Sequence, residues 1–349
     1  MWTSAKDQGI AKNEGKKKGG RHILAWLRQN AASSVAYVGG PAVRAQALAK
    51  RYPGATAVRG VDLAVAPGET FGFLGPNGAG KTTTIGMLCT LTAPTSGDAW
   101  IDGHSVRTAP DRVRRSIGLV FQETTLDLGL TAWENLRFHA RLYGVRADDA
   151  RERARDLLDL AGLADRRDDP VAAFSGGMRR RLEIVRALMH RPRVLFLDEP
   201  TVGLDPQTRA RIWEHLHRLR RREGITLFLT THYLDEAEHC DRVAIIDGGA
   251  IVAEGTPAEL KDVVGADRVE LRTGDDAAAA ERLRGAFGLE PALGPAGLSV
   301  RVADGASFVP RLCAGLDVPI DAVTVVRPSL DDVFLHYTGR TIRDEGAAR

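Results

Sequence analysis

The sequence predicts an α/β protein built on a parallel sheet, with a smaller α+β domain after it. A glycine-rich segment, GPNGAGKTT (75–83), stands between a short apolar run and a helix-like segment. Two more apolar runs, RVLFLDEP and ITLFLTTH, have the composition of strands that are buried on both faces of a parallel sheet. From about residue 266 the pattern becomes strand, helix, two strands, helix and strand, the split-βαβ order.

The segment between the two apolar runs has the start and stop signals of a helix. Asp205 can cap this helix, Pro206 suits its first position, and Gly224 can end it. Its expected buried stripe consists of apolar residues on one side: Ile212, Leu216 and Leu219. Strands that alternate with helices in this way indicate a parallel sheet. After them, RVAIIDGGAIVAEG predicts a hairpin that turns at residues 248–249.

Residues from about 123 to 190 lack strand-like runs, and we expect them to form a helical subdomain inserted between sheet elements. TAWE (131–134) has the spacing of a capping box, which marks a helix start. Within residues 178–189, one face of a helix is apolar: Leu182, Val185 and Leu188. The arginines at 179–181 are interpreted as a solvated side of that helix.

The 349 residues can hold one large and one small domain, and their composition is that of ordinary globular proteins. No apolar run approaches the roughly 20 residues of a membrane-spanning helix, so a membrane role requires a partner. The three cysteines, Cys89, Cys240 and Cys313, form no CxxC pair. Their spacing predicts no metal site and suits reduced thiols in a cytoplasm.

Residues 1–43 are predicted to be a disordered basic extension. The first 30 residues hold seven Lys or Arg against two Asp or Glu, which leaves a net charge of −2 for the remaining chain out of +3 overall. A body with that charge is a poor nucleic-acid binder. Two alternatives stay open: the extension binds anionic lipid through apolar residues at 23–27, or a start near Val43 removes it.

The GPNGAGKTT segment has the context of a phosphate-binding loop, because it follows a strand and opens a helix. Gly75, Gly78 and Gly80 let backbone N–H groups converge on phosphate. Lys81 supplies a positive charge to the β- and γ-phosphates, and Thr82 a hydroxyl to Mg²⁺. The segment therefore predicts binding of a nucleoside triphosphate.

Two adjacent carboxylates end the apolar run VLFLDEP (194–200). In a chain with a phosphate loop, Asp198 is placed to hold Mg²⁺, directly or through water. Glu199 is placed to polarise the water that attacks the terminal phosphate, since phosphoryl transfer to water needs a positioned acceptor.

The order of these segments resembles the nucleotide-binding subunit of ATP-binding cassette (ABC) transporters over about residues 44–265. Gln122 in GLVFQE matches the Q-loop of that family, and FSGGM (174–178) its signature motif. GLDP (203–206) matches the D-loop, and His232 the switch histidine. Tyr52 matches the aromatic residue that stacks on adenine, a kind of contact worth about 1–3 kcal/mol.

By this resemblance two subunits pair head to tail, and the signature of one closes over the nucleotide on the other. Catalysis falls to Lys81, Gln122, Glu199 and His232. The residues implied at ATP are Tyr52, Gly75, Pro76, Asn77, Gly78, Ala79, Gly80, Lys81, Thr82, Thr83, Ser175, Gly176, Gly177 and Asp205. Those implied at Mg²⁺ are Thr82, Gln122 and Asp198. The implied partners are a second copy of the chain and an integral membrane permease that binds the transported substrate; no nucleic acid is expected.

Three segments resemble a narrower group, the daunorubicin/doxorubicin-resistance-type exporter ATPases: SGGMRRRLEI, DEPTVGLDPQTR and SLDDVFLHYTGR (329–340). This resemblance implies an ATPase on the cytoplasmic face of the cell membrane that powers export of a drug, antibiotic or other amphipathic compound. Residues 266–340 would be the accessory domain of that group, and 341–349 a tail. Phe174 and Met178 stand where the commoner signature has leucine and glutamine, and methionine cannot hydrogen-bond as glutamine would.

Two other classes are weighed against the transporter ATPase. A soluble ABC-type ATPase that acts on ribosomes or DNA is the first, but this chain has one cassette and no long coiled coil or CxxC pair. A regulator that binds nucleotide without hydrolysis is the second, and the presence of Lys81, Asp198, Glu199 and His232 opposes it.

The resemblance also assigns the segment after Gln122 to the surface that receives a short helix of the permease. Any one of the apolar residues in this segment is explained equally by burial in the core, but as a group they are the candidates for this contact: Leu126, Leu128, Leu130 and Trp133. Trp133 is the foremost candidate, because large aromatic residues dominate interface energetics.

Overall fold

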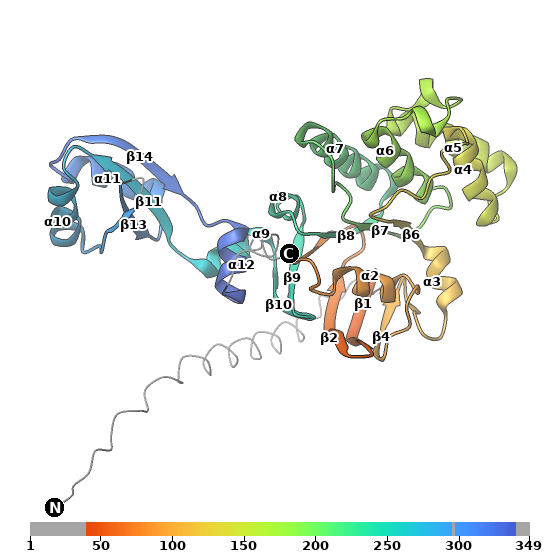
Figure 1. Ribbon diagram of the computed structural model, residues 1–349, viewed down its shortest axis with the longest axis horizontal. Coiled ribbons are helices and arrows are strands. Elements are labelled where there is room, and N and C mark those ends of the chain that lie inside the picture. The colour runs from red at the N-terminus through yellow and green to blue at the C-terminus, as the bar shows by residue number, and fades with distance from the viewer. Residues whose placement is uncertain (1–39, 295–296, 340–349) are drawn as a thin grey trace, which may run out of the picture. The chain divides into compact units, whose positions relative to one another are not determined.

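A computed structural model of the chain describes residues 40–294 and 297–339, which are coloured in Figure 1. This part contains three sheets with helices packed against them. The predicted extension precedes residue 40 almost entirely, and the predicted tail follows residue 340. The predictions for residues 1–39 and for the tail therefore lie outside the described residues. None of the described helices is both long and apolar enough to cross a membrane.

The first sheet is antiparallel and has the strand order β2-β1-β4-β5. Its strands are β1 (Val43–Tyr52), β2 (Ala55–Val65), β4 (Ser96–Ile101) and β5 (His104–Ser105). Strand β1 begins one residue before the predicted domain start. Val43 pairs with Val65 on one side and with Ile101 on the other, which buries it completely. The last residue of the predicted extension therefore belongs to the folded domain.

The second sheet is the centre of the fold, with the order β10-β9-β3-β8-β7-β6 (Figure 1). Its strands are β3 (Thr70–Leu74), β6 (Ile117–Val120), β7 (Val194–Asp198), β8 (Thr226–Thr231), β9 (Arg242–Asp247) and β10 (Ala250–Gly255). All neighbours are parallel except β9 and β10, which form the predicted hairpin. Every residue of β3, β7 and β8 is buried, as the continuous apolar runs predict. The predicted α/β class is confirmed.

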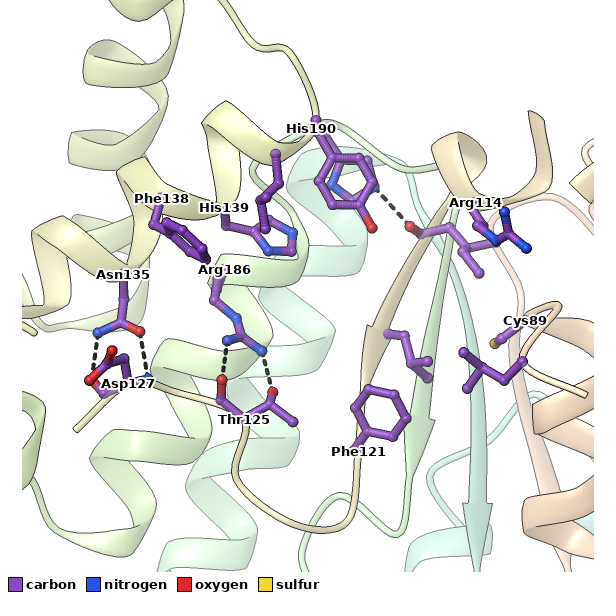
Figure 2. Close-up of a pocket in the computed structure, with 15 residues that line it drawn as sticks. Cys89, Arg114, Phe121, Thr125, Asp127, Asn135, Phe138, His139, Arg186 and His190 are labelled. Atoms are coloured by element: carbon purple, nitrogen blue, oxygen red, sulfur yellow. Dashed lines mark hydrogen bonds between the residues drawn. The ribbon is translucent and has the colours of Figure 1, made fainter. Parts of the chain in front are cut away.

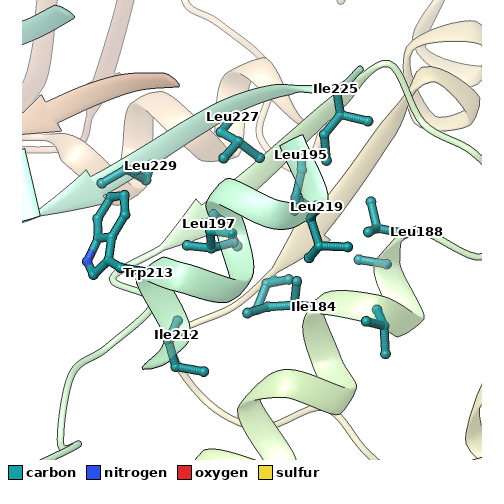
Figure 3. Packing of buried hydrophobic residues seen from close by; sticks show 14 of the residues in the cluster. Ile184, Leu188, Leu195, Leu197, Ile212, Trp213, Leu219, Ile225, Leu227 and Leu229 are labelled. Carbon is teal, nitrogen blue, oxygen red and sulfur yellow. The ribbon is translucent and has the colours of Figure 1, made fainter. Parts of the chain in front are cut away.

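Successive side chains of β7 and β8 enter two different cores, because side chains alternate across a strand. Phe196 and Phe228 point into a cluster shared with the antiparallel sheet and with α2 (Lys81–Leu88). Leu195 and Leu227 point to the opposite side, into a cluster shared with the helices. Figure 3 shows Leu195 close to Leu219 of the helix α7 (Pro206–Glu223), with Leu227 on the neighbouring strand. The central sheet is therefore covered on both faces.

Helix α7 (Pro206–Glu223) starts and stops as its sequence predicts. The Asp205 side chain accepts a hydrogen bond from the N–H of Thr208 at 3.0 Å, and Pro206 occupies the first turn. Gly224 ends the helix in the left-handed conformation, at φ 62°. The predicted stripe is buried: Ile212, Leu216 and Leu219. Two short helices, α3 (Pro110–Ser116) and α8 (Leu234–Ala237), complete this part of the fold.

Between β6 and β7 the described chain is helical. Its elements are α4 (Ala132–Leu142), α5 (Ala147–Ala161), the 3₁₀ turns η1 (Ala164–Arg166) and η2 (Val171–Ala173), and α6 (Gly176–Ala187). The predicted capping box is present at the start of α4, where Thr131 and Glu134 exchange hydrogen bonds. The predicted apolar face of α6 is buried: Leu182, Val185 and Leu188.

The third sheet lies in the C-terminal part of the chain and is antiparallel, with the order β12-β13-β11-β14. The elements here are α9 (Pro257–Val264), β11 (Asp267–Thr273), α10 (Asp276–Phe287), β12 (Ala292–Gly294), β13 (Gly297–Val302), α11 (Gly305–Gly315), β14 (Ile320–Val326) and α12 (Leu330–Thr338). This is the predicted split-βαβ order. Phe334 of α12 is buried in the same cluster as Leu260 of α9.

Candidate functional site

Three neighbouring strands of the central sheet end at the same edge, and each leads into predicted site residues. β3 runs into the GPNGAGKTT loop, β7 ends at Asp198 just before Glu199, and β8 ends just before His232. The strands are parallel and adjacent in the order β3-β8-β7, so their carboxyl ends lie side by side. Ligands of open α/β sheets bind at such ends.

The phosphate loop is packed so closely that two of its positions require glycine. Gly80 has a φ of 106°, and a Cβ there would lie 2.5 Å from the carbonyl oxygen of Ala57. A Cβ on Gly75 would overlap the carbonyl oxygen of Ile246. Asn77 and Gly78, at the tip of the loop, are exposed. The loop therefore presents its tip to solvent while its two ends are held against β2 and β9.

Lys81 joins the loop to the end of β7. Its side chain is buried, and Nζ donates hydrogen bonds to the carbonyl oxygens of Gly75 at 2.6 Å and Pro76 at 3.0 Å. The same Nζ lies 3.4 Å from Oε1 of Glu199. The ammonium group is thus already placed between the loop and the predicted catalytic carboxylate.

Asp198 and Glu199 are both buried, at 5% and 8% exposure. Asp198 Oδ1 accepts a hydrogen bond from the Thr230 hydroxyl at 2.5 Å, and the N–H of Glu199 donates to that hydroxyl at 3.1 Å. Glu199 has a φ of 47°, in the left-handed region that non-glycine residues rarely adopt. A strained residue of this kind at a strand end is a frequent feature of active sites.

The charge of Glu199 is set by its neighbours. Burial raises the pKa of this carboxyl, but the hydrogen bond from His232 and the charge of Lys81 outweigh burial and hold it below its ordinary value. His232 Nδ1 lies 3.1 Å from Glu199 Oε1. Because the carboxylate is ionised, Nδ1 is the donor in this bond. Glu199 is therefore an acceptor at neutral pH, as a residue that positions water must be.

The same edge has the oxygen ligands that a magnesium ion prefers. Asp198 and Glu199 are two buried carboxylates at the end of β7. Glu199 pairs with the Lys81 ammonium group, and the hydroxyl-bearing Thr82 follows Lys81 at the start of α2. Hard oxygen donors with excess negative charge fit Mg²⁺. No group of three or more His, Cys, Asp or Glu side chains in the described chain could hold a metal by itself. The residues thus fit an ion that also takes oxygens from a phosphate.

The signature segment begins α6 and is exposed at its tip. Ser175 is the N-cap of the helix, and its Oγ accepts a hydrogen bond from the N–H of Met178 at 3.3 Å. Ser175 and Gly176 are exposed, whereas Phe174 is buried in the helical cluster and Met178 packs partly against it. The two unusual signature residues are therefore accommodated by packing, and the serine and first glycine remain open to solvent.

The other predicted contacts are spread around these two segments. Tyr52, at the end of β1, is 44% exposed, and the ammonium group of Lys50 lies over its ring, 5.1 Å from the ring centroid. Gln122 and Thr82 are exposed, and Thr83 is partly exposed. Asp205 uses its carboxylate to cap α7, and hydrogen bonds from Thr208 lower its pKa.

One interpretation of the sequence is wrong. Arg180 is buried, not solvated, and its guanidinium group donates to backbone carbonyls at the end of β7 and β6. Arg179 and Arg181 also bond to carbonyls, those of Ala172 and Ala161. No periodicity could show this, because three consecutive arginines look alike until the neighbouring loops are in place.

A separate groove lies where α4 meets the central sheet, with a cavity volume of about 430 Å³ (Figure 2). Its apolar lining includes several exposed side chains: Leu91, Phe121, Phe138, Leu142 and Tyr143. Its polar lining includes Arg186, which donates to Thr125, and His190, whose ring stacks on Tyr143 at 3.8 Å. Phe121 directly precedes Gln122, so the groove adjoins the predicted Q-loop.

Family models match both parts of the chain. The model described as ABC transporter matches residues 58–202, and the one described as ATP-binding protein DrrA1-3-like, C-terminal domain, matches residues 255–338.

Curated relatives are similar over most of the chain. The daunorubicin/doxorubicin resistance ATP-binding protein DrrA of Streptomyces peucetius is 43% identical over 311 residues, covering 87% of this chain and 94% of that protein. The linearmycin resistance ATP-binding protein LnrL of Bacillus subtilis is 36% identical and covers 86% of this chain and 100% of its own. The Nod factor export ATP-binding protein I of Ralstonia nicotianae is 41% identical, with 87% and 96% covered.

Solved structures show the same fold. cbiO1 from Clostridium perfringens, part of the ABC transporter complex cbiONQ, is 30% identical, with a TM-score of 0.60 over 64% of this chain and 93% of that one. A dimeric ATP-binding cassette in a post-hydrolysis state with ADP and Pi is 29% identical, with a TM-score of 0.56 over 61% of this chain and 98% of that one.

Proposed function

The chain belongs to the ATP-binding subunits of ABC transporters and is a transporter ATPase of the DrrA-like group, and from this premise we propose how its residues work and what they serve. We propose that two copies of the chain bind ATP between them and drive a separate membrane permease from the cytoplasmic face. The exported compound is a drug, antibiotic or other amphipathic molecule, by analogy with relatives named for daunorubicin and linearmycin resistance. A soluble ATPase acting on ribosomes or DNA remains the alternative class, and no observation favours it.

The observation that carries the catalytic assignment is the cluster of Lys81, Glu199 and His232 at three adjacent strand ends. Before nucleotide arrives, Lys81 pairs with Glu199 and with the loop carbonyls. The phosphates of ATP offer Lys81 a stronger partner, which leaves the Glu199 carboxylate to accept a hydrogen bond from the attacking water. His232, which donates to Glu199, keeps that carboxylate ionised and oriented. The water oxygen then bonds to the γ-phosphorus as the bond from that phosphorus to the β–γ bridging oxygen breaks. ADP leaves with the bridging oxygen, and the proton lost by the water ends on the released inorganic phosphate or in solvent.

Magnesium, when bound, neutralises charge on the β- and γ-phosphates. The residues that would hold it are Thr82, Gln122 and Asp198. The Thr230 hydroxyl fixes the Asp198 carboxylate in place, so the aspartate is oriented before the ion arrives.

Two features support head-to-tail pairing. Ser175 and Gly176 are exposed at the start of α6, where unpaired N–H groups and the helix dipole attract anions. The Tyr52 ring and the tip of the phosphate loop are likewise open to solvent. Each chain would supply the phosphate loop of one site and the signature of the other.

The groove beside Phe121 is the proposed docking site for a short helix of the permease. Its aromatic and aliphatic rim is exposed, which is unusual for a soluble surface without a partner. This changes the expectation for Trp133, which does not line the groove but packs partly against the helical core, with Arg167 over its ring. Leu126 is also buried in that core. Phe138, 59% exposed, replaces Trp133 as the foremost contact.

The groove is tested with Phe138→Ala. Loss of a central aromatic contact costs about 2 kcal/mol, so affinity for the permease should fall about 30-fold while ATPase activity of the isolated subunit persists. Trp133→Ala is the matched control, since it removes an aromatic residue of the same helix that faces the core. If Trp133→Ala lowers the affinity for the permease as much as Phe138→Ala does, the docking site is not this groove.

The catalytic assignment is tested with Glu199→Gln, which keeps the shape and removes the acceptor charge. ATP binding should persist while turnover falls about a hundredfold or more, because general-base positioning is lost. ATP should then trap a closed dimer that size-exclusion chromatography detects. Normal hydrolysis by this variant would remove Glu199 from the proposed role.

A further inference from the structure

Arg180 lies two residues after the signature and points into the molecule. It is 6% exposed, and its guanidinium group donates to four backbone carbonyls in two different loops. A buried guanidinium group is costly unless its donors are satisfied. The resemblance to known transporters assigns this residue no role, and the distances below show what it connects.

The first loop that Arg180 contacts follows β7. Nε donates to the carbonyl oxygen of Pro200 at 2.6 Å, and Nη2 lies 3.3 Å from the carbonyl oxygens of both Asp198 and Glu199. Glu199 is the residue with a φ of 47°. Such a conformation persists only where the surroundings hold it. Arg180 holds the peptide groups on either side of it.

The second loop is the one that contains Gln122. Nη1 of Arg180 donates to the carbonyl oxygen of Phe121, directly before Gln122. The same Nη1 lies 3.1 Å from Glu183 Oε2, and Glu183 Oε1 accepts a hydrogen bond from the N–H of Thr125 at 2.7 Å. The ion pair therefore fixes both ends of the segment 121–125.

The arrangement needs the shape of arginine. Burial lowers the pKa of Arg180, and the charge of Glu183 opposes that effect. A guanidinium group has five donors in a planar fork, whereas an ammonium group is a compact charge that cannot span carbonyls on two loops. Lysine would keep the charge near Glu183 and lose the bridge.

We propose that Arg180, with Glu183, is a positioning residue for ATP hydrolysis that sets Glu199 and Gln122 in one frame with the signature helix. If α6 moves when the signature contacts nucleotide, Arg180 would then shift Glu199 and Gln122 together. This inference rests on the proposed roles of Glu199 and Gln122 in the site.

The test compares Arg180→Lys with Arg153→Lys. Arg153, on α5, is equally buried at 8% exposure and is also paired with a glutamate, Glu223. Its hydrogen bonds go to Glu223 and to the carbonyl oxygen of Leu188, not to either catalytic loop. Both variants replace a buried guanidinium group by an ammonium group and keep the positive charge. The control therefore distinguishes a loss of stability from a loss of positioning of the catalytic loops.

We expect Arg180→Lys to lower kcat at saturating ATP about 10- to 100-fold, the cost of a misplaced catalytic group, with the Kd for ATP unchanged. Arg153→Lys should lower the melting temperature similarly and keep kcat. Equal loss of kcat in the two variants, or a loss confined to ATP binding, overturns the inference. Should Arg180→Lys fail to fold, Glu183→Gln, which keeps an acceptor for Thr125, takes its place and should lower kcat in the same way.

Amide hydrogen exchange on the nucleotide-free protein gives a readout that does not depend on catalysis. Arg180→Lys should speed exchange at 122–125 and at 199–202 together, whereas Arg153→Lys should leave both segments protected. If only one segment responds, Arg180 does not couple them. The unsubstituted chain could prove to have no ATPase activity while Arg180→Lys still speeds exchange at both segments. That result would reject the catalytic assignment of Glu199 and support the connection of the two loops by Arg180.

Discussion

The two halves of the proposed ATP site are built in opposite ways. The phosphate-loop half is buried and cross-linked: Lys81, Asp198 and Glu199 are at most 8% exposed, and hydrogen bonds join the ends of β3, β7 and β8. The signature half is exposed: Ser175 and Gly176 are open to solvent, and the serine side chain bonds within its own helix.

This difference shows which contacts position the residues of each half. The first half is complete within one chain, because parallel strands bring its residues together. The second half is open to solvent, and in the proposed pairing it meets a phosphate held by a second chain. We therefore expect a single subunit to bind ATP and a pair to hydrolyse it.

The largest expected effects distinguish the two halves by their contributions to ATP affinity and to turnover. Lys81→Ala removes a charged partner of the phosphates, worth about 1.5–3 kcal/mol, so the isolated subunit should bind ATP about 10- to 100-fold more weakly. Ser175→Arg should leave that binding intact and abolish turnover. Isothermal titration with each purified variant measures the first quantity, and phosphate release the second. Weak ATP binding by Ser175→Arg would mean that both halves act within one chain.

An intermediate effect is expected when the two inactive variants are mixed. A heterodimer of Lys81→Ala and Ser175→Arg rebuilds one intact site from the unmutated half of each chain. Half of the dimers would be heterodimers with one of two sites intact, so about a quarter of wild-type activity should return. If labelled chains show heterodimers and phosphate release stays at background, Ser175 does not contact nucleotide across the pair.

The smallest effect concerns acid. Burial lowers the pKa of His215 on α7 to about 4 and that of His139 on α4 to about 3, in the helical cluster that includes α6. A histidine with a depressed folded pKa binds its proton mainly after unfolding, so stability is lost as pH falls below about 6.5. Because of His215, the free energy of unfolding should fall by about 2 kcal/mol between pH 7 and pH 5. In the phosphate-loop half, the lowered pKa of Glu199 gives a stabilisation that is fully present above about pH 4.5 and is lost only as the pH falls further, so it does not change between pH 7 and pH 5.

Hydrogen exchange at pH 7 and pH 5 checks this prediction, with rates corrected for the intrinsic pH dependence. Protection should fall in the four helices α4, α5, α6 and α7 and persist in α2 and β7. His139→Gln should flatten the pH dependence. Equal loss of protection in both halves at pH 5 would contradict it.

The phosphate loop, the two carboxylates and His232 could be predicted because each is a short segment at the end of a strand. Such motifs can be recognised from the spacing of residues that are close in sequence. Gly80 is part of a glycine-rich loop, and Asp198 ends an apolar run, and both features are visible without knowledge of the sheet order. The capping residues Thr131 and Asp205 were predictable for the same reason, since a cap involves only the next three residues.

The lining of the proposed docking groove could not be predicted from the sequence. Leu126 and Trp133 look like surface candidates beside Gln122, yet one is buried and the other packs against the helical core. Phe138 and Leu91 line the groove from positions that are far apart in sequence. Which apolar residue is exposed depends on which helices cover it, and that is a property of packing.

By itself, the sequence determined the α/β class, the phosphate loop and the order of the site residues, because these depend on local spacing and on apolar runs long enough to be buried strands. Only the tertiary structure decided that Lys81 meets Glu199, that the middle one of three arginines enters the molecule, and that β6 and β7 share Arg180. The physical reason is that a charge or a donor acquires its role from the partners around it, and those partners come from strands that only the folded sheet places side by side.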